Sequence, residues 1–91
     1  MTMEKQYLVD WDVWNVQTQT YEPEGLCDWA YAESEEEAIN LMMDYIIENS
    51  DDWDIDREGE VLKLSHEYHD SANRLFAQNL EYRNFHIHIT D

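Results

Sequence analysis

Apolar and polar residues alternate near the start of the chain with the period of a β-strand. Over residues 7–16 one set of alternate positions is apolar, and we expect it to face a core: Tyr7, Val9, Trp11 and Val13. The opposite set places two carboxylates and an indole on the outer face, from Asp10, Asp12 and Trp14. The pattern therefore predicts a strand with one buried and one exposed side.

The segment that follows has the composition of a turn. Residues 17–25 are polar and contain the only proline of the chain and one of its two glycines, which predicts a loop or wide hairpin turn. Residues 26–33 then show a second strand pattern. We expect this strand to pair antiparallel with the first.

A helix is predicted from Ser34 to about Glu48. Ser34 with Glu37 three positions later forms a capping box, and Glu35 and Glu36 lie near the positive end of the helix dipole. At 100° per residue, one side of the helix is apolar: Ala38, Met42, Tyr45 and Ile46. The narrow remaining side is acidic and carries Glu37, Asp44 and Glu48. The helix should pack deeply and expose a line of carboxylates.

The second half of the chain has weaker patterns. Residues 50–59 predict an acidic connection with Trp53 and Ile55 as anchors, 61–65 a short strand, 70–78 a short second helix and 82–90 a final strand. The last strand would carry Phe85, Ile87 and Ile89 on one face. The order β-β-α-β-(α)-β predicts an α+β fold, with an antiparallel sheet of about four strands and one main helix on one face. Residues 1–91 should form a single domain.

Charge is the strongest compositional signal. The chain has 22 acidic and five basic residues, for a net charge of −17. Residues 1–56 hold 16 acidic residues and one basic residue, a net of −15, so the remainder carries only −2. Direct nucleic-acid binding is disfavoured, because contacts to phosphate need Lys and Arg. Aromatic residues make up 13% of the chain, which argues against disorder.

Location is predicted from absences in the sequence. No apolar run approaches the roughly 20 residues of a membrane span, and the start of the chain lacks a signal-peptide pattern. Cys27 is the only cysteine, so no internal disulfide can form. We expect a cytoplasmic protein without membrane contact, located in the host cytoplasm if it is phage-encoded.

Tryptophan and acidic residues recur side by side, in Asp10-Trp11-Asp12, Asp28-Trp29 and Asp52-Trp53-Asp54. Indoles are frequent interface hot spots, and surrounding charge sets orientation and association rate. Carboxylates spaced like phosphates can occupy a groove built for a nucleic-acid backbone. The alternative is that the indoles are core and the acids are their solvated neighbours. The candidate partner-binding residues are Asp10, Asp12, Trp14, Glu37, Asp44, Glu48, Asp52, Trp53, Asp54 and Asp56.

Two patterns in the sequence are typical of metal sites, and each has a simpler explanation. The spacings of His66 with His69 and of His86 with His88 would build a four-ligand zinc site if the two segments meet, but surface histidines are the simpler reading. Residues 54–59, DIDREG, match the first half of a calcium loop, although Ser65 occupies the place of the bidentate glutamate. We therefore assign no metal and no cofactor.

Catalytic motifs are absent from the sequence. It contains no G-x-S-x-G, no phosphate-cradling glycine loop and no Cys–His motif. Cys27 lies beside Asp28, whose charge disfavours a thiolate. We expect a protein that is not an enzyme.

In size, charge and aromatic content the chain resembles the small acidic inhibitors carried by phages and mobile elements. The similarity is compositional and covers chiefly residues 1–56. Members of that class block CRISPR or restriction effectors by occupying nucleic-acid sites. Residues 31–39, YAESEEEAI, also resemble a strand-to-helix junction common in small bacterial and phage β-β-α domains.

The sequence therefore favours a non-enzymatic acidic inhibitor that occupies a basic nucleic-acid-binding site on a CRISPR, restriction or other DNA-processing effector. Two alternatives stay open. One is a metal-binding accessory or regulatory domain that uses the C-terminal histidines. The other is a small oligomeric structural domain whose apolar helix packs against a copy of itself. The protein would be a monomer or a small homo-oligomer.

Overall fold

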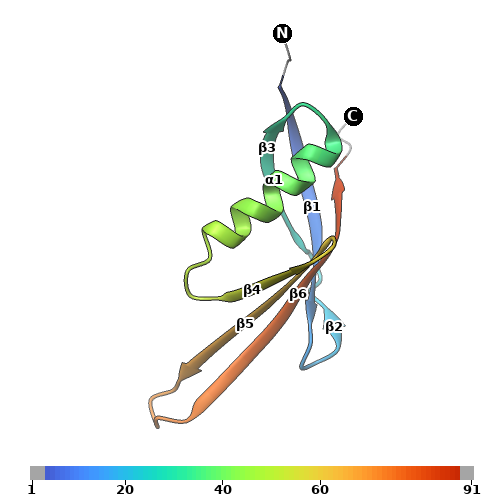
Figure 1. Cartoon of the computed structure of the whole chain (residues 1–91). Helices are drawn as coiled ribbons and strands as arrows, with labels where there is room; N and C mark the ends of the chain where they lie inside the picture. The colour runs from blue at the N-terminus through green and yellow to red at the C-terminus, as the bar shows by residue number, and fades with distance from the viewer. Residues whose placement is uncertain (1–3, 89–91) are drawn as a thin grey trace.

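One long strand organises the fold, which we describe for residues 4–88 from a computed structural model. β1 (Lys5–Asn15) pairs antiparallel with β6 (Leu75–Ile87) along one edge. Along its other edge β1 pairs with β3 (Leu26–Ala32) and with the two-residue β2 (Thr20–Tyr21). The antiparallel pairing of the first two predicted strands is thereby confirmed, and β2 forms within the segment predicted as a loop (Figure 1).

The sheet is larger than the sequence predicted. β5 (Val61–His69) pairs with β6, and β4 (Asp54–Glu58) pairs with β5. The sheet has six strands in the order β2-β1-β6-β5-β4, with β3 also on β1, so the prediction of about four strands is wrong, although the fold is α+β. The acidic connection predicted at 50–59 contains β4 because Ile55 and Arg57 alternate with its carboxylates and find pairing partners on β5.

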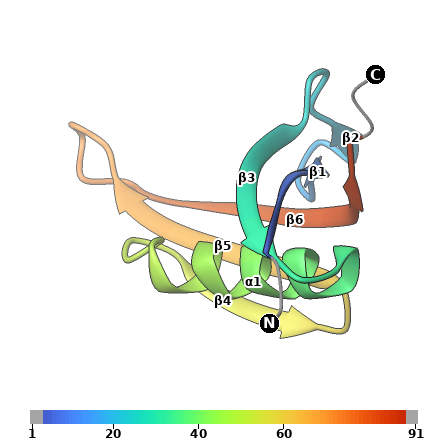
Figure 2. The ribbon, with the colours of Figure 1, turned by 90° about the horizontal axis from the view of Figure 1, so that it is seen from above.

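Helix α1 (Glu35–Glu48) lies across one face of the sheet (Figures 1 and 2) and begins as predicted. The Glu37 N–H donates to Ser34 Oγ at 3.2 Å, and Glu37 Oε2 accepts from the Glu33 N–H at 3.1 Å. This arrangement pairs backbone donors that the first helical turn leaves free. At the other end, the Asn49 N–H and Nδ2 both donate to the Tyr45 carbonyl.

The core lies between α1 and the sheet. Its most deeply buried large side chains are Met43, Leu62 and Val9. Trp11 and Val13 of β1 are also buried, as the alternation predicted. We call the face of the sheet that carries these residues the helix side and the opposite face the open side. The prediction for Tyr45 is wrong: it is 54% exposed, because Met42, Met43 and Ile46 fill the contact with the sheet.

A β-bulge adjusts the pairing of β1 with β6. Asp10 pairs with His86 and Asp12 with Arg83, so two residues of β6 lie opposite Trp11. Asn84, within the bulge, has φ of 59°, a left-handed conformation that Asn tolerates better than most residues. The extra residue shifts the alternation, so that Tyr82 and Phe85 both stack near Trp11, with ring centroids 5.8 and 5.3 Å away.

The β5–β6 hairpin extends beyond the rest of the sheet as an arm, residues 66–78, and contributes to extents of 57 × 24 × 23 Å (Figures 1 and 2). The pairing of β4 ends at Ser65 and that of β1 at Leu80, so the arm is two-stranded. On its helix side Trp53, His66, Tyr68 and Phe76 follow one another, with neighbouring ring centroids 5.2 to 5.6 Å apart.

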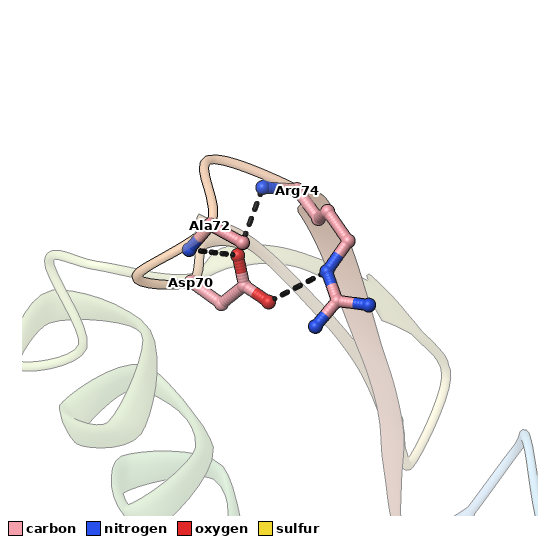
Figure 3. A network of polar contacts seen from close by, with 3 residues as sticks. All are labelled: Asp70, Ala72 and Arg74. Carbon is pink, nitrogen blue, oxygen red and sulfur yellow. Dashed lines mark hydrogen bonds and ion pairs between the residues drawn. The ribbon is translucent and has the colours of Figure 1, made fainter.

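The prediction of a second helix over 70–78 is wrong. Asp70 Oδ1 accepts hydrogen bonds from the backbone N–H groups of Ala72 and Arg74, each 2.9 Å long, and Asp70 Oδ2 accepts from Arg74 Nε (Figure 3). Asn73 has φ of 60°, which supports a tight turn rather than a helix. The hydrogen bond from the Arg74 backbone, with those from its side chain and Ala72, lowers the pKa of Asp70 from its ordinary value of 3.8. The predicted strand at 82–90 begins earlier, at Leu75, and Ile89 lies outside the described residues.

Among the described residues, no helix combines the length and the apolar character that crossing a membrane requires.

Candidate functional site

The predicted partner-binding residues do not form one surface. Strand alternation places Asp10, Asp12 and Trp14 of β1 on the open side. Asp54 and Asp56 of β4 share that side, because Ile55 between them packs against the core. The remaining predicted residues belong to α1 or to the connection that follows it: Glu37, Asp44, Glu48, Asp52 and Trp53. The sheet therefore divides the predicted site into two groups.

On the open side, the β1 carboxylates already have partners within the protein. Asp10 Oδ2 lies 2.7 Å from His88 Nδ1 and 3.7 Å from His86 Nε2. Asp12 Oδ2 accepts a hydrogen bond from Asn84 Nδ2 at 2.9 Å. Binding a cationic partner here would require these contacts to be replaced, so Asp10 and Asp12 are poorly suited to the role predicted for them.

Acidic and basic side chains alternate across the open side. The pairing register forms one row from Asp56 through Lys63 and Glu81 to Trp14. Lys63 Nζ lies 2.8 Å from Glu58 Oε2, and this hydrogen bond raises the pKa of Lys63.

Arg83 lies at the end of this row and joins three neighbours. Its hydrogen bond to the Tyr21 hydroxyl and its ion pair with Glu81, at 2.8 Å, raise the pKa of Arg83. The guanidinium carbon also lies 4.6 Å from the ring centroid of Trp14. Trp14 is thus a half-buried platform for Arg83, and the open side is a surface of mixed charge on which several carboxylates are paired.

The helix side is more uniformly acidic. Residues 33–60, from the end of β3 through α1 to the turn after β4, contain 12 acidic residues and one basic residue. Asp54, Asp56 and Glu58 of this segment lie on the open side, which leaves nine acidic residues and Arg57, a net charge of −8. The seven carboxylates of the helix and the connection after it are exposed: Glu35, Glu36, Glu37, Asp44, Glu48, Asp51 and Asp52. Of these, only Glu37 has a capping role. This cluster, which we call the helix carboxylates, is free to meet a partner.

Arg57 is the one basic residue of that segment. Its guanidinium donates to Asn40 Oδ1 at 2.5 Å and to the Gly59 carbonyl at 3.0 Å, and it lies 3.6 Å from Asp44 Oδ1. These contacts join β4 to α1. Asp44 nevertheless keeps 63% of its side chain exposed, so Arg57 compensates only part of the charge.

Sequence reasoning missed a groove between β3 and α1, with a volume of about 530 Å³. Trp29 and Tyr31 line it from the strand, and Leu41 and Tyr45 line it from the helix. A signal was present in the sequence: Trp29 and Tyr31 alternate with Ala30 and Ala32. The small residues are the buried ones, so the large rings are left at the surface.

The two histidine pairs do not meet. His66 lies on the helix side of the arm and stacks between Trp53 and Tyr68, whereas His86 and His88 contact Asp10 on the open side. His69 ends β5 at the arm. Among residues 4–88, no group of three or more His, Cys, Asp or Glu side chains is placed to hold a metal ion. The calcium-like segment forms β4 and the turn after it, so its carboxylates alternate along a strand and do not surround a common point.

Comparison with protein-family models, with curated proteins and with solved structures found no significant match to this chain. Any assignment of function therefore depends on the chain's own surface. Two features of that surface stand out, namely the exposed helix carboxylates and the apolar groove beside them.

Proposed function

We propose that this protein is a non-enzymatic acidic binding protein that occupies a basic nucleic-acid-binding site on a CRISPR, restriction or other DNA-processing effector. The observation that carries the proposal is the contrast in charge pairing. The helix carboxylates lie in a segment whose helix-side residues carry a net charge of −8 with one basic residue, whereas the open side has carboxylates beside Lys63, Arg83 and the C-terminal histidines.

Exposed and uncompensated carboxylates are costly to keep together. Their mutual repulsion lowers the stability of the folded chain, and a basic surface would relieve it on binding. A groove that holds a nucleic-acid backbone offers Arg and Lys at close spacing. Asp44, Glu48, Asp51 and Asp52 are exposed at the end of α1 and just after it, where they present successive negative charges. This part of the helix carboxylates is the proposed substitute for phosphates.

The proposal is tested by competition. A panel of purified CRISPR and restriction effectors is loaded with fluorescently labelled DNA or guide RNA, and the full-length protein is added while anisotropy is recorded. We expect at least one effector to release its nucleic acid. Affinity for that effector should fall steeply with salt, because exposed charges more than about 8 Å apart are largely screened at physiological ionic strength.

Two results would contradict the proposal. One is that every effector that binds the protein keeps its nucleic acid, which would indicate a contact away from the nucleic-acid site. The other is binding whose affinity does not change between low and high salt, because such a contact would not depend on the helix carboxylates.

A further inference from the structure

The groove between β3 and α1 combines apolar surface, negative charge and a free strand edge. Trp29 is 51% exposed, Tyr31 62% and Tyr45 54%, and all three line the groove together with Leu41. The pairing of Trp29 with Leu8 and of Tyr31 with Gln6 places these two rings on the open side of the strand edge, whereas Leu41 and Tyr45 lie on the helix side. Exposed rings on both sides of one strand edge are typical of contact surfaces. Their position beside the helix carboxylates places both features within reach of one partner.

The strand edge is available for pairing. Among the described residues β3 pairs only with β1, so alternate backbone groups of β3 point away from the sheet. The Leu8 carbonyl accepts from the His88 N–H on the β6 side, and Leu8 is the register partner of Trp29. The Trp29 backbone therefore faces outward, and the same alternation applies to Cys27 and Tyr31.

A carboxylate currently bonds to this edge. Asp28 Oδ1 accepts from the Trp29 N–H at 2.7 Å, which gives an outward-facing backbone donor a partner within the chain. An exposed edge strand with a local acceptor of this kind is protected against unspecific pairing. An incoming strand would supply a carbonyl to the same N–H and release the Asp28 carboxylate to pair with a cation.

The charge of the groove selects the occupant. Three carboxylates line it, from Asp28, Asp44 and Glu48, and among the ion pairs of the described residues only Asp44 of the three has a basic partner, Arg57. An acidic or phosphorylated segment would be repelled, and a second copy of this chain would bring the same carboxylates against one another. An extended segment with Arg at alternate positions would turn the Arg side chains toward these carboxylates and Tyr45, and the residues between them toward Trp29 and Tyr31.

We propose that this groove binds an extended basic segment of the partner protein, with Arg or Lys at alternate positions and apolar residues between them, as an additional strand on β3. Backbone hydrogen bonds to β3 would fix its register, and the carboxylates and rings would select its side chains. The inference rests on the proposed function, which supplies the basic character of the partner. It adds which part of the partner this chain binds.

The test uses the full-length protein and defined peptides. Amide NMR shifts of the ¹⁵N-labelled protein are followed during titration with an acetylated eight-residue peptide of alternating Arg and Val. We expect saturable binding with the largest shifts at Cys27, Trp29 and Tyr31. The same peptide with backbone N-methyl groups on alternate residues should bind about tenfold more weakly, since it loses its donors to the β3 edge.

Matched variants test the charge requirement. Asp28→Asn with Glu48→Gln should weaken the Arg–Val peptide about tenfold, because two of the three lining carboxylates are neutralised. Asp54→Asn with Asp56→Asn removes the same charge from the open side and should leave affinity within about twofold. Dispersed amide spectra for both variants confirm that they are folded.

Four outcomes would overturn the inference. Three concern the peptides: the Arg–Val peptide does not bind, a peptide with Arg and Val in separate blocks binds with equal affinity, or N-methylation leaves the affinity unchanged. The fourth is that the amide shifts of β3 change with protein concentration alone, which would indicate pairing between copies. If the peptide fails while an effector still releases its nucleic acid, the groove assignment is wrong and the proposed function stands. If the peptide binds and no effector releases its nucleic acid, the proposed function is wrong and the groove assignment stands.

Discussion

Carboxylates line both sides of the sheet, and the two sides differ in what surrounds them. On the open side, Glu58 lies beside Lys63, Glu81 beside Arg83 and Asp10 beside His88, so these three carboxylates have partners within the fold. On the helix side, the residues of segment 33–60 carry a net charge of −8 and include only Arg57 as a base. Local composition alone does not distinguish these cases, because the pairing of strands determines which charges meet. The comparison indicates that the fold uses one side for internal stability and leaves the other available.

The largest expected effect on stability concerns Arg57, the one basic residue of segment 33–60. Replacing Arg57 by Ala removes hydrogen bonds to Asn40 and Gly59 and the ion pair with Asp44, so the free energy of unfolding should fall by about 2 kcal/mol. Lys63→Ala on the open side is the control, and should lower the free energy of unfolding by clearly less, because its ion pair is exposed. Urea unfolding measures both. Equal losses of unfolding free energy in the two variants would show that the two sides are not differently organised.

Salt should act in opposite directions on folding and on binding. Raising the ionic strength from 0.01 to 0.15 M shortens the screening length from about 30 to about 8 Å. Repulsion among the helix carboxylates is then reduced, and the melting temperature should rise by about 5 °C. Calorimetry over this range checks the effect. A melting temperature that falls with salt would mean that attractive pairs, such as those of the open side, dominate.

A single charge reversal on each side should change stability with opposite sign. Glu48 follows Asp44 by one helical turn and lies at the negative end of the helix dipole, so Glu48→Lys should stabilise the fold by about 0.5–1 kcal/mol. Glu58→Lys makes the same change in net charge but places a cation beside Lys63, and should be destabilising. Thermal unfolding compares the two variants. Stabilisation by both would indicate that only total charge matters.

The smallest expected effect lies in the arm, away from both surfaces. Because the folded pKa of Asp70 is below the ordinary value of 3.8, its carboxylate stabilises the turn above that pH, and the contribution is lost as pH falls toward the lower folded value. Asp70→Ala should speed amide exchange at Ala72 and Arg74 at pH 6. It should also remove the difference in their protection from exchange between pH 6 and pH 3. The exchange rate at each pH is first corrected for its intrinsic dependence. An unchanged profile in the variant would exclude this role.

Local signals predicted the helix and the first two strands well. Ser34, Glu37 and the spacing of Ala38, Met42 and Ile46 define a helix without reference to the rest of the chain. The turn at Asp70 was mistaken for a helix start because Asp and Ser, which open this segment, are common both at helix N-termini and in turns. β4 was missed because its carboxylates have low strand propensity and are held there by pairing with β5, which is tertiary context.

The candidate site was only partly accessible from sequence. Charge and aromatic content identified Asp44, Glu48 and Asp52 as exposed carboxylates, which they are. Alternation correctly placed Asp10 and Asp12 on the outer face of the first strand. Spacing could not show that they contact His88 and Asn84, because those contacts join the two ends of the chain. The groove beside β3 depends on which strand lies at the edge, and that follows from topology.

The most direct test of the account compares two triple variants of equal charge in the effector competition assay. One neutralises the helix side, with Asp44→Asn, Glu48→Gln and Asp52→Asn. The other neutralises the open side, with Asp54→Asn, Asp56→Asn and Glu58→Gln. We predict that the first loses about 100-fold in affinity for the effector and the second less than about threefold. Equal losses, or a greater loss for the open-side variant, would contradict the assignment of binding to the helix carboxylates.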